Sequence, residues 1–127
     1  MKSIKKPQGH QTVIPYIRVE DPLGFIKWTQ DVFGAQQIDM VKAEDDSVRH
    51  AQIKIDDSVI MLSQAREEWP VDNATFYIYL IDLDKTFQKA VNLGADNIFD
   101  PYVEDYGAKS AGLRDPFGNY WWLAEVL

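Results

Sequence analysis

The sequence lacks cysteine altogether and contains only two histidines, His10 and His50, among its 127 residues. Without cysteine, the chain cannot form disulfides, use a thiolate as a nucleophile or build a zinc site that contains sulfur. This absence fits a reducing compartment, and we expect the protein in the cytoplasm. A chain of this length buries roughly two thirds of the surface that it exposes when unfolded, which is enough for a core without such cross-links.

Basic residues and long apolar runs are also scarce. The chain has 13 Lys and Arg residues against 20 Asp and Glu residues, and its formal net charge is −7. Nucleic-acid backbones are bound mainly through basic contacts, so we expect no nucleic-acid partner. No apolar run is long enough to cross a bilayer, and the basic residues 1–7 are not followed by the apolar segment of a signal peptide. We therefore expect no membrane partner.

The first half of the chain combines strand patterns with one helical pattern. Residues 13–19 alternate with the period of two that is typical of a half-buried strand. Asp21 and Pro22 predict the start of a helix, because aspartate caps free N–H groups and proline fits the first helical position. Gly34 predicts its end. Further strands are predicted at residues 37–43, 48–55 and 58–63.

The same order returns after a linker at residues 66–73. An offset of 61 residues (80 − 19) aligns Val19-Glu20-Asp21 with Leu80-Ile81-Asp82, and Gly-Ala follows both helices. We therefore predict an α+β fold in a single domain, 1–127, of two tandem βαβββ modules at about residues 12–64 and 74–126. The second module is predicted to contain strands at 74–81, 97–102, 110–114 and 119–126, a helix capped by Asp82 or Asp84 and closed by Gly94, and a turn at 115–119.

Five segments carry a pattern that can be compared with known families: residues 10–16, 32–35, 49–55, 57–62 and, most specifically, 114–122 (Arg-Asp-Pro-Phe-Gly-Asn-Tyr-Trp-Trp). With the two modules, they resemble the vicinal oxygen chelate superfamily over about residues 10–125. That superfamily includes glyoxalases, extradiol dioxygenases, fosfomycin-modifying enzymes and bleomycin-binding resistance proteins, and the chain looks most like its PhnB-like branch. The resemblance implies curled mixed sheets, with helices on the convex side and a pocket on the concave side.

The resemblance also implies four metal-ligand positions, on the first and last strands of each module, where the family has His or Gln, Glu, His and Glu. None of the four residues that this chain has at these positions is a histidine or a carboxylate. A divalent ion needs three or four nitrogen or oxygen ligands, so we expect no metal of the usual kind and no cofactor. Glu125, three residues after Trp122, should face the other side of its strand. The alternative is a rearranged site of His10, His50 and a carboxylate. Carried over by strand register, the four positions hold Ile14, Met61, Thr75 and Trp122.

Strand parity, placed by the family register, predicts a concave face rich in rings. Rings stack on flat or cationic ligands, and Arg18 offers a partner for a carboxylate or phosphate. The alternative is that the rings fill the barrel or a dimer interface. Residues 102–109, with Gly107, are predicted as a loop over the pocket mouth. The predicted lining is Tyr16, Tyr77, Tyr79, Tyr120 and Trp122, with Arg18, His50 and Gln52 as polar groups.

Three functions agree with these features. The first is a metal-free protein that binds a small aromatic or cationic organic molecule. The second is a metal-dependent lyase, isomerase or dioxygenase with a rearranged site, and the third is a structural or regulatory dimer with a filled pocket. No residue is singled out as catalytic. Family members commonly pair and half-barrels leave strand edges open, so we also expect a homodimer.

Overall fold

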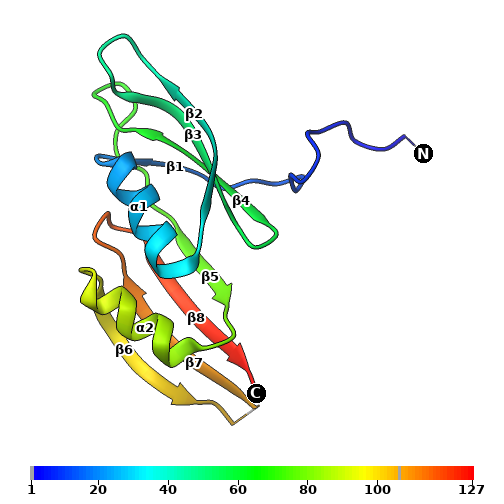
Figure 1. The fold of residues 1–127 in the computed structure, drawn as a ribbon, viewed down its shortest axis with the longest axis vertical. Coiled ribbons are helices and arrows are strands. Elements are labelled where there is room, and N and C mark those ends of the chain that lie inside the picture. The colour runs from blue at the N-terminus through cyan, green and yellow to red at the C-terminus, as the bar shows by residue number, and fades with distance from the viewer. Residues whose placement is uncertain (1, 106) are drawn as a thin grey trace. The chain divides into compact units, whose positions relative to one another are not determined.

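The computed structural model describes residues 2–105 and 107–127 (Figure 1). The chain divides into two compact units, which we call unit 1 (Met1–Asp72) and unit 2 (Asn73–Leu127). Each unit has a four-stranded sheet and one helix in the order predicted from the sequence, β-α-β-β-β. Each is described by itself below. Neither described helix is long and apolar enough to span a bilayer.

Unit 1 arranges its strands in the order β1-β4-β3-β2, with β1 parallel to β4 and the other neighbours antiparallel. Helix α1 begins where the sequence predicts, because the Asp21 side chain accepts a hydrogen bond from the backbone N–H of Gly24. It ends at Gly34, which adopts the left-handed conformation with φ of 71°. The elements are β1 (Tyr16–Val19), α1 (Pro22–Phe33), β2 (Gln36–Lys42), β3 (Val48–Ile55) and β4 (Ser58–Gln64).

Strand β1 is shorter than the predicted strand at residues 13–19. Pro15 has no N–H to donate, but its carbonyl accepts a hydrogen bond of 3.0 Å from the Met61 N–H at the start of the ladder. Val13, two residues earlier, is 83% exposed and belongs to the N-terminal arm. The Gln11 side chain attaches this arm to β4, where it bonds both the N–H and the carbonyl of Val59 at 3.1 and 2.8 Å.

Unit 2 has the equivalent strand order, β5-β8-β7-β6, with β5 parallel to β8. Asp82, rather than Asp84, caps α2 by accepting from the Lys85 N–H, whereas Asp84 pairs with Lys109. The predicted loop at 102–109 is shorter than expected, because β6 continues to Val103 and β7 begins at Ala108; residue 106 of that prediction lies outside the described residues. The elements are β5 (Thr75–Tyr79), α2 (Leu83–Asn92), β6 (Asp96–Val103), β7 (Ala108–Arg114) and β8 (Tyr120–Val126).

The strand register confirms the internal repeat. Tyr16 lies opposite Met61 in unit 1, and Tyr77 lies opposite Trp122 in unit 2, so both members of the pair are shifted by 61 residues (77 − 16 and 122 − 61). The helix caps Asp21 and Asp82 keep the same offset. The two units are therefore copies of one pattern in structure, although their sequences have diverged.

Each helix packs on one face of its own sheet, and the core of each unit lies between that helix and that sheet (Figure 1). The buried strand residues follow the period of two that an extended chain imposes. In unit 1 they include Ile17, Val19, Ala51, Ile53 and Leu62, each at most 1% exposed. In unit 2 they include Ala111, Leu113, Trp121 and Leu123, again at most 1% exposed.

Candidate ligand-binding site

The eight residues predicted to line a pocket divide equally between the units. Tyr16, Arg18, His50 and Gln52 belong to unit 1, and Tyr77, Tyr79, Tyr120 and Trp122 belong to unit 2. Within each unit, they lie on strand positions that alternate with the buried core positions. Strand parity therefore predicted the exposed face of each sheet, the face opposite the helix.

In unit 2 this face carries rings on three of its four strands, β5, β8 and β6. The Tyr77 and Tyr79 side chains are 57% and 70% exposed, and their ring centroids are 5.4 Å apart. Tyr120 and Trp122 follow on β8, at 5.8 Å from each other. The band continues on β6 from Trp122 to Phe99 and from Phe99 to Tyr102, each step 5.8 Å. We call the rings of these six residues the aromatic band.

Gly112 on β7 allows the ring on β6 and the ring on β8 to contact each other across the strand that separates them. It lies in register with Phe99 on one side and Trp122 on the other. A Cβ atom at this position would come within 2.4 Å of the Phe99 ring and 2.6 Å of the Trp122 ring. The missing side chain lets the two rings stack with their planes inclined by 27°. The sequence did not point to Phe99 or Tyr102, because β6 contains register shifts that break simple alternation.

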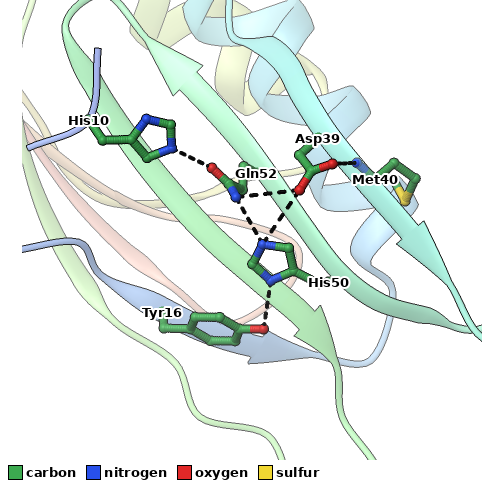
Figure 2. Close-up of polar contacts among 6 residues, drawn as sticks. All are labelled: His10, Tyr16, Asp39, Met40, His50 and Gln52. Atoms are coloured by element: carbon green, nitrogen blue, oxygen red, sulfur yellow. Dashed lines mark hydrogen bonds and ion pairs between the residues drawn. The ribbon is translucent and has the colours of Figure 1, made fainter. Parts of the chain in front are cut away.

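In unit 1 the same face carries a series of hydrogen-bonded side chains, which we call the polar chain: Tyr16, His50, Gln52 and His10 (Figure 2). The Tyr16 hydroxyl lies 3.1 Å from His50 Nδ1, and His50 Nε2 lies 3.0 Å from the Gln52 amide nitrogen. The Gln52 amide oxygen in turn lies 2.7 Å from His10 Nε2. The N-terminal arm thus reaches the sheet through His10, and the sequence spacing did not predict that contact.

The donors and acceptors of the polar chain can be assigned from the Gln52 amide nitrogen. The Gln52 amide nitrogen can only donate, so His50 Nε2 accepts and a neutral His50 carries its proton on Nδ1. Nδ1 then donates to the Tyr16 oxygen, which leaves the phenol hydrogen for another acceptor. Asp39 supports this orientation, since its Oδ2 lies 3.5 Å from the same amide nitrogen. The arrangement presents Tyr16 as a hydrogen-bond donor at the surface of the sheet.

The residues at the four inferred metal-ligand positions do not fit a divalent ion. Met61 lies in register between Tyr16 and Gln52, and an isoleucine, a threonine and a tryptophan hold the other positions. Gln52 separates His10 from His50, although the Asp39 Oδ2 lies 3.8 Å from His50 Nε2. Within residues 2–105 and 107–127, no group of three or more His, Asp or Glu side chains could hold a metal.

Glu125 faces the helix side of its strand, as predicted. Its carboxylate accepts a hydrogen bond of 3.0 Å from the Leu83 N–H at the start of α2. Lys109 lies in register with Glu125 and pairs with Asp84 on the same helix. These charged groups therefore hold α2 against its sheet and take no part in the aromatic band.

Arg18 lies apart from the polar chain and is held by the segment after β4. Its Nε donates to the Pro70 carbonyl at 2.9 Å, and its Nη2 lies 3.2 Å from the Asp72 carboxylate. The guanidinium also lies over the Trp69 ring, 5.5 Å from the centroid. Trp69 was not predicted as part of a site, because it lies in a segment that reads only as a linker.

Comparisons with known proteins agree with this architecture. Among solved structures, TioX from Micromonospora sp. ML1 superposes with a TM-score of 0.73 at 20% identity, covering 91% of this chain and 95% of that one. A Bacillus cereus protein described as a putative 3-demethylubiquinone-9 3-methyltransferase, PhnB protein, gives 0.72 at 12% identity, covering 91% and 99%. These two likenesses concern the fold alone.

Similarity in sequence extends over most of the chain. An uncharacterised protein of Mycobacterium bovis is 25% identical over 124 residues, covering 89% of this chain and 82% of the relative. The family profile of the Glyoxalase/Bleomycin resistance protein/Dioxygenase superfamily matches residues 9–123. The chain therefore belongs to the glyoxalase/bleomycin resistance protein/dioxygenase superfamily.

Proposed function

We propose that this protein binds a small aromatic or cationic organic molecule on the ring-bearing faces of its sheets, above all on the aromatic band of unit 2. The observation that carries the proposal is a face with exposed rings on β5 beside neighbouring rings on β8 and β6, where Trp122 and Phe99 stack across β7. Tyr77 and Tyr79 are more than half exposed, whereas Trp121 and Leu123, on the other face, are buried. An exposed row of rings offers a flat ligand a large contact area without rearrangement.

The same rings suit a positive charge. The Arg114 guanidinium lies over the Tyr120 ring at 5.8 Å from its centroid, so this face already holds one cation by its π system. The net charge of −7 also attracts cationic ligands in solution. Acidic side chains also border these rings, because Asp96 lies opposite Arg114 in register and the Glu104 carboxylate accepts a hydrogen bond of 2.6 Å from the Tyr102 hydroxyl.

The proposed binding has no metal-dependent step. The side chains at the inferred ligand positions lack the nitrogen and oxygen donors that a divalent ion needs. A chelator should therefore leave binding unchanged. The alternative, a metal-dependent lyase, isomerase or dioxygenase with a rearranged site, would depend on the proximity of His50 to Asp39.

Titration of tryptophan fluorescence with flat cationic and flat neutral compounds, with and without EDTA, tests the proposal. We expect quenching by at least one class and about 3- to 10-fold weaker binding in Tyr77→Ala, the loss typical of one stacked ring. Ile81→Ala is the matched control, because Ile81 is 93% exposed just beyond β5 and belongs to no ring contact described above. Equal affinity in both variants, no response to any compound, or binding that EDTA abolishes would contradict the proposal.

We further infer that the protein forms a homodimer through its open sheet edges. Among the described residues, β2 and β6 are each the last strand of their own sheet, and they expose Ile38, Val41, Ile98 and Val103 by 42–62%. Edge strands with exposed apolar side chains favour pairing with another chain. Sedimentation at micromolar concentration should give about twice the chain mass of 14.6 kDa. A monomer at the same concentration would contradict this inference.

A further inference from the structure

Three of the four arginines in the chain line one groove of unit 1. The groove has a volume of about 320 Å³, near the lower end of the range for small-molecule sites. It lies where β1 and β4 end, beside the segment that contains Trp69. Its walls contain no carboxylate and no lysine. The lining residues are Tyr16, Arg18, Arg49, Ser63, Gln64, Arg66 and Trp69.

Arg18 is fixed before any ligand arrives. Its contacts with Pro70, Asp72 and Trp69 occupy two of its five N–H groups and one face of its plane. Only 24% of the side chain is exposed. A guanidinium that is already oriented loses little entropy when it binds an anion, and its planar fork matches a carboxylate or phosphate.

The arginines exceed the acidic groups that contact them. Asp72 contacts Arg18 at 3.2 Å, and Glu68 lies 3.9 Å from Arg66. Arg66 also borders a neighbouring hollow that Asp45 and Glu68 line, so its charge is partly balanced. Arg49 is exposed and makes no ion pair with the described residues. The lining of the groove is therefore cationic in a chain that is negative overall, and the carboxylates of Asp72, Glu68 and Asp45 lie outside that lining.

The walls also offer neutral groups that suit an oxyanion attached to a ring. The Tyr16 hydroxyl borders the groove, and its proton is free to be donated outward because His50 Nδ1 supplies the hydrogen bond to its oxygen. Ser63 adds a second hydroxyl. Trp69 is 61% exposed and can cover a flat group.

We infer that this groove binds the carboxylate or phosphate group of a small aromatic molecule, with the anion at the arginines and the ring against Tyr16 and Trp69. The inference is independent of the proposed aromatic band, which lies in unit 2. It also explains how an acidic protein can attract an anion, because charges more than about 8–10 Å away are screened at physiological salt.

Calorimetric titration with benzoate, phenyl phosphate, inorganic phosphate and benzyl alcohol tests the inference, and the indole N–H resonance of Trp69 locates the site. We expect benzoate or phenyl phosphate to bind at least about tenfold more tightly than benzyl alcohol. The probe that binds more tightly identifies which anionic group, carboxylate or phosphate, the groove prefers. Raising the salt concentration should weaken both. Inorganic phosphate that binds as tightly as phenyl phosphate would overturn the role of the ring.

Two substitutions that remove one arginine each provide the matched comparison. Arg49→Gln should weaken binding of the anion about tenfold, and Arg66→Gln should weaken it less because Glu68 already balances Arg66. Lys27→Gln changes the net charge equally but lies on α1, which packs on the other face of the unit 1 sheet, and Lys27 does not line the groove, so it should have less than about a twofold effect. Equal effects of Arg49→Gln and Lys27→Gln, or no preference for the anions over benzyl alcohol, would refute an anion site here. Failure of flat cations to bind the aromatic band would leave this result unaffected.

Discussion

Phe99 and Trp122 stack across β7 with their ring centroids 5.8 Å apart, and Gly112 between them provides the space. Gly112→Ala should destabilise the protein by about 1–3 kcal/mol, because the new Cβ would overlap both rings. Urea denaturation measures the loss, and near-ultraviolet circular dichroism reports the Trp122 environment. In a Phe99→Leu background the same substitution should cost less, since one of the two rings is gone. Additive effects of the two changes would show that Gly112 serves another purpose.

Asp115 organises the turn before β8 through a buried carboxylate. It is 3% exposed and accepts from the N–H groups of Phe117 and Asn119, the Asn119 amide and the Trp121 indole, at 2.8–3.0 Å. We expect Asp115→Asn to lower the free energy of unfolding by about 2–4 kcal/mol, because an amide nitrogen would face donors. Asp57→Asn in an exposed turn is the control and should change it by less than about 0.5 kcal/mol. Chemical denaturation followed by tryptophan fluorescence compares the two, and equal losses would contradict the role of Asp115.

Gln52 connects the N-terminal arm to the sheet through His10. Removing the amide in Gln52→Ala takes away the hydrogen bond to His10 and the donor to His50, so amide hydrogen exchange at residues 8–12 should become faster. Gln37→Ala is the matched control, because Gln37 is exposed on β2 and belongs to no part of the polar chain. The arm also depends on Gln11, so Gln11→Ala should give a larger increase in exchange than Gln52→Ala. Unchanged exchange in both Gln52→Ala and Gln11→Ala would mean that the arm is held by other contacts.

Lys109 links β7 to the first turn of α2. The hydrogen bond with Asp84 raises the pKa of Lys109 above its ordinary value of 10.5. The folded state therefore binds the proton more tightly, and this contribution to stability is present below pH 10.5 and is lost as the pH rises through the folded-state pKa. An NMR titration of the lysine side chains should show the pKa of Lys109 falling in Asp84→Asn and unchanged in Asp31→Asn. A fall of equal size in both variants would contradict a specific pairing.

The secondary structure was predictable because its signals are local. Asp21 and Asp82 cap helices with their own side chains, and the strands bury every second residue against the helix. The start of β1 was predicted too early, since alternation alone does not show that Val13 lies outside the sheet. Similarly, the 102–109 segment contains charged residues and a glycine that suggest a loop, but its ends pair as β6 and β7.

The candidate site was predictable only where it follows strand parity. Parity identified Tyr77, Tyr120 and Trp122, which lie on regular strands. It did not identify Phe99, which reaches Trp122 across a glycine and after a register shift. The contacts of His10 with Gln52 and of Trp69 with Arg18 join residues 42 and 51 positions apart (52 − 10 and 69 − 18), and no local pattern encodes such distances.

The alternation along β8 gives its residues two unrelated duties. Trp121 and Leu123 are buried in the core against α2, whereas Tyr120 and Trp122 lie on the opposite face of the sheet. Substitution of an outward ring therefore changes the exposed face of the sheet and leaves the packing against α2 in place. Trp122 is less free to be substituted than Tyr120, because its ring, together with that of Phe99, covers Gly112 and the backbone of β7.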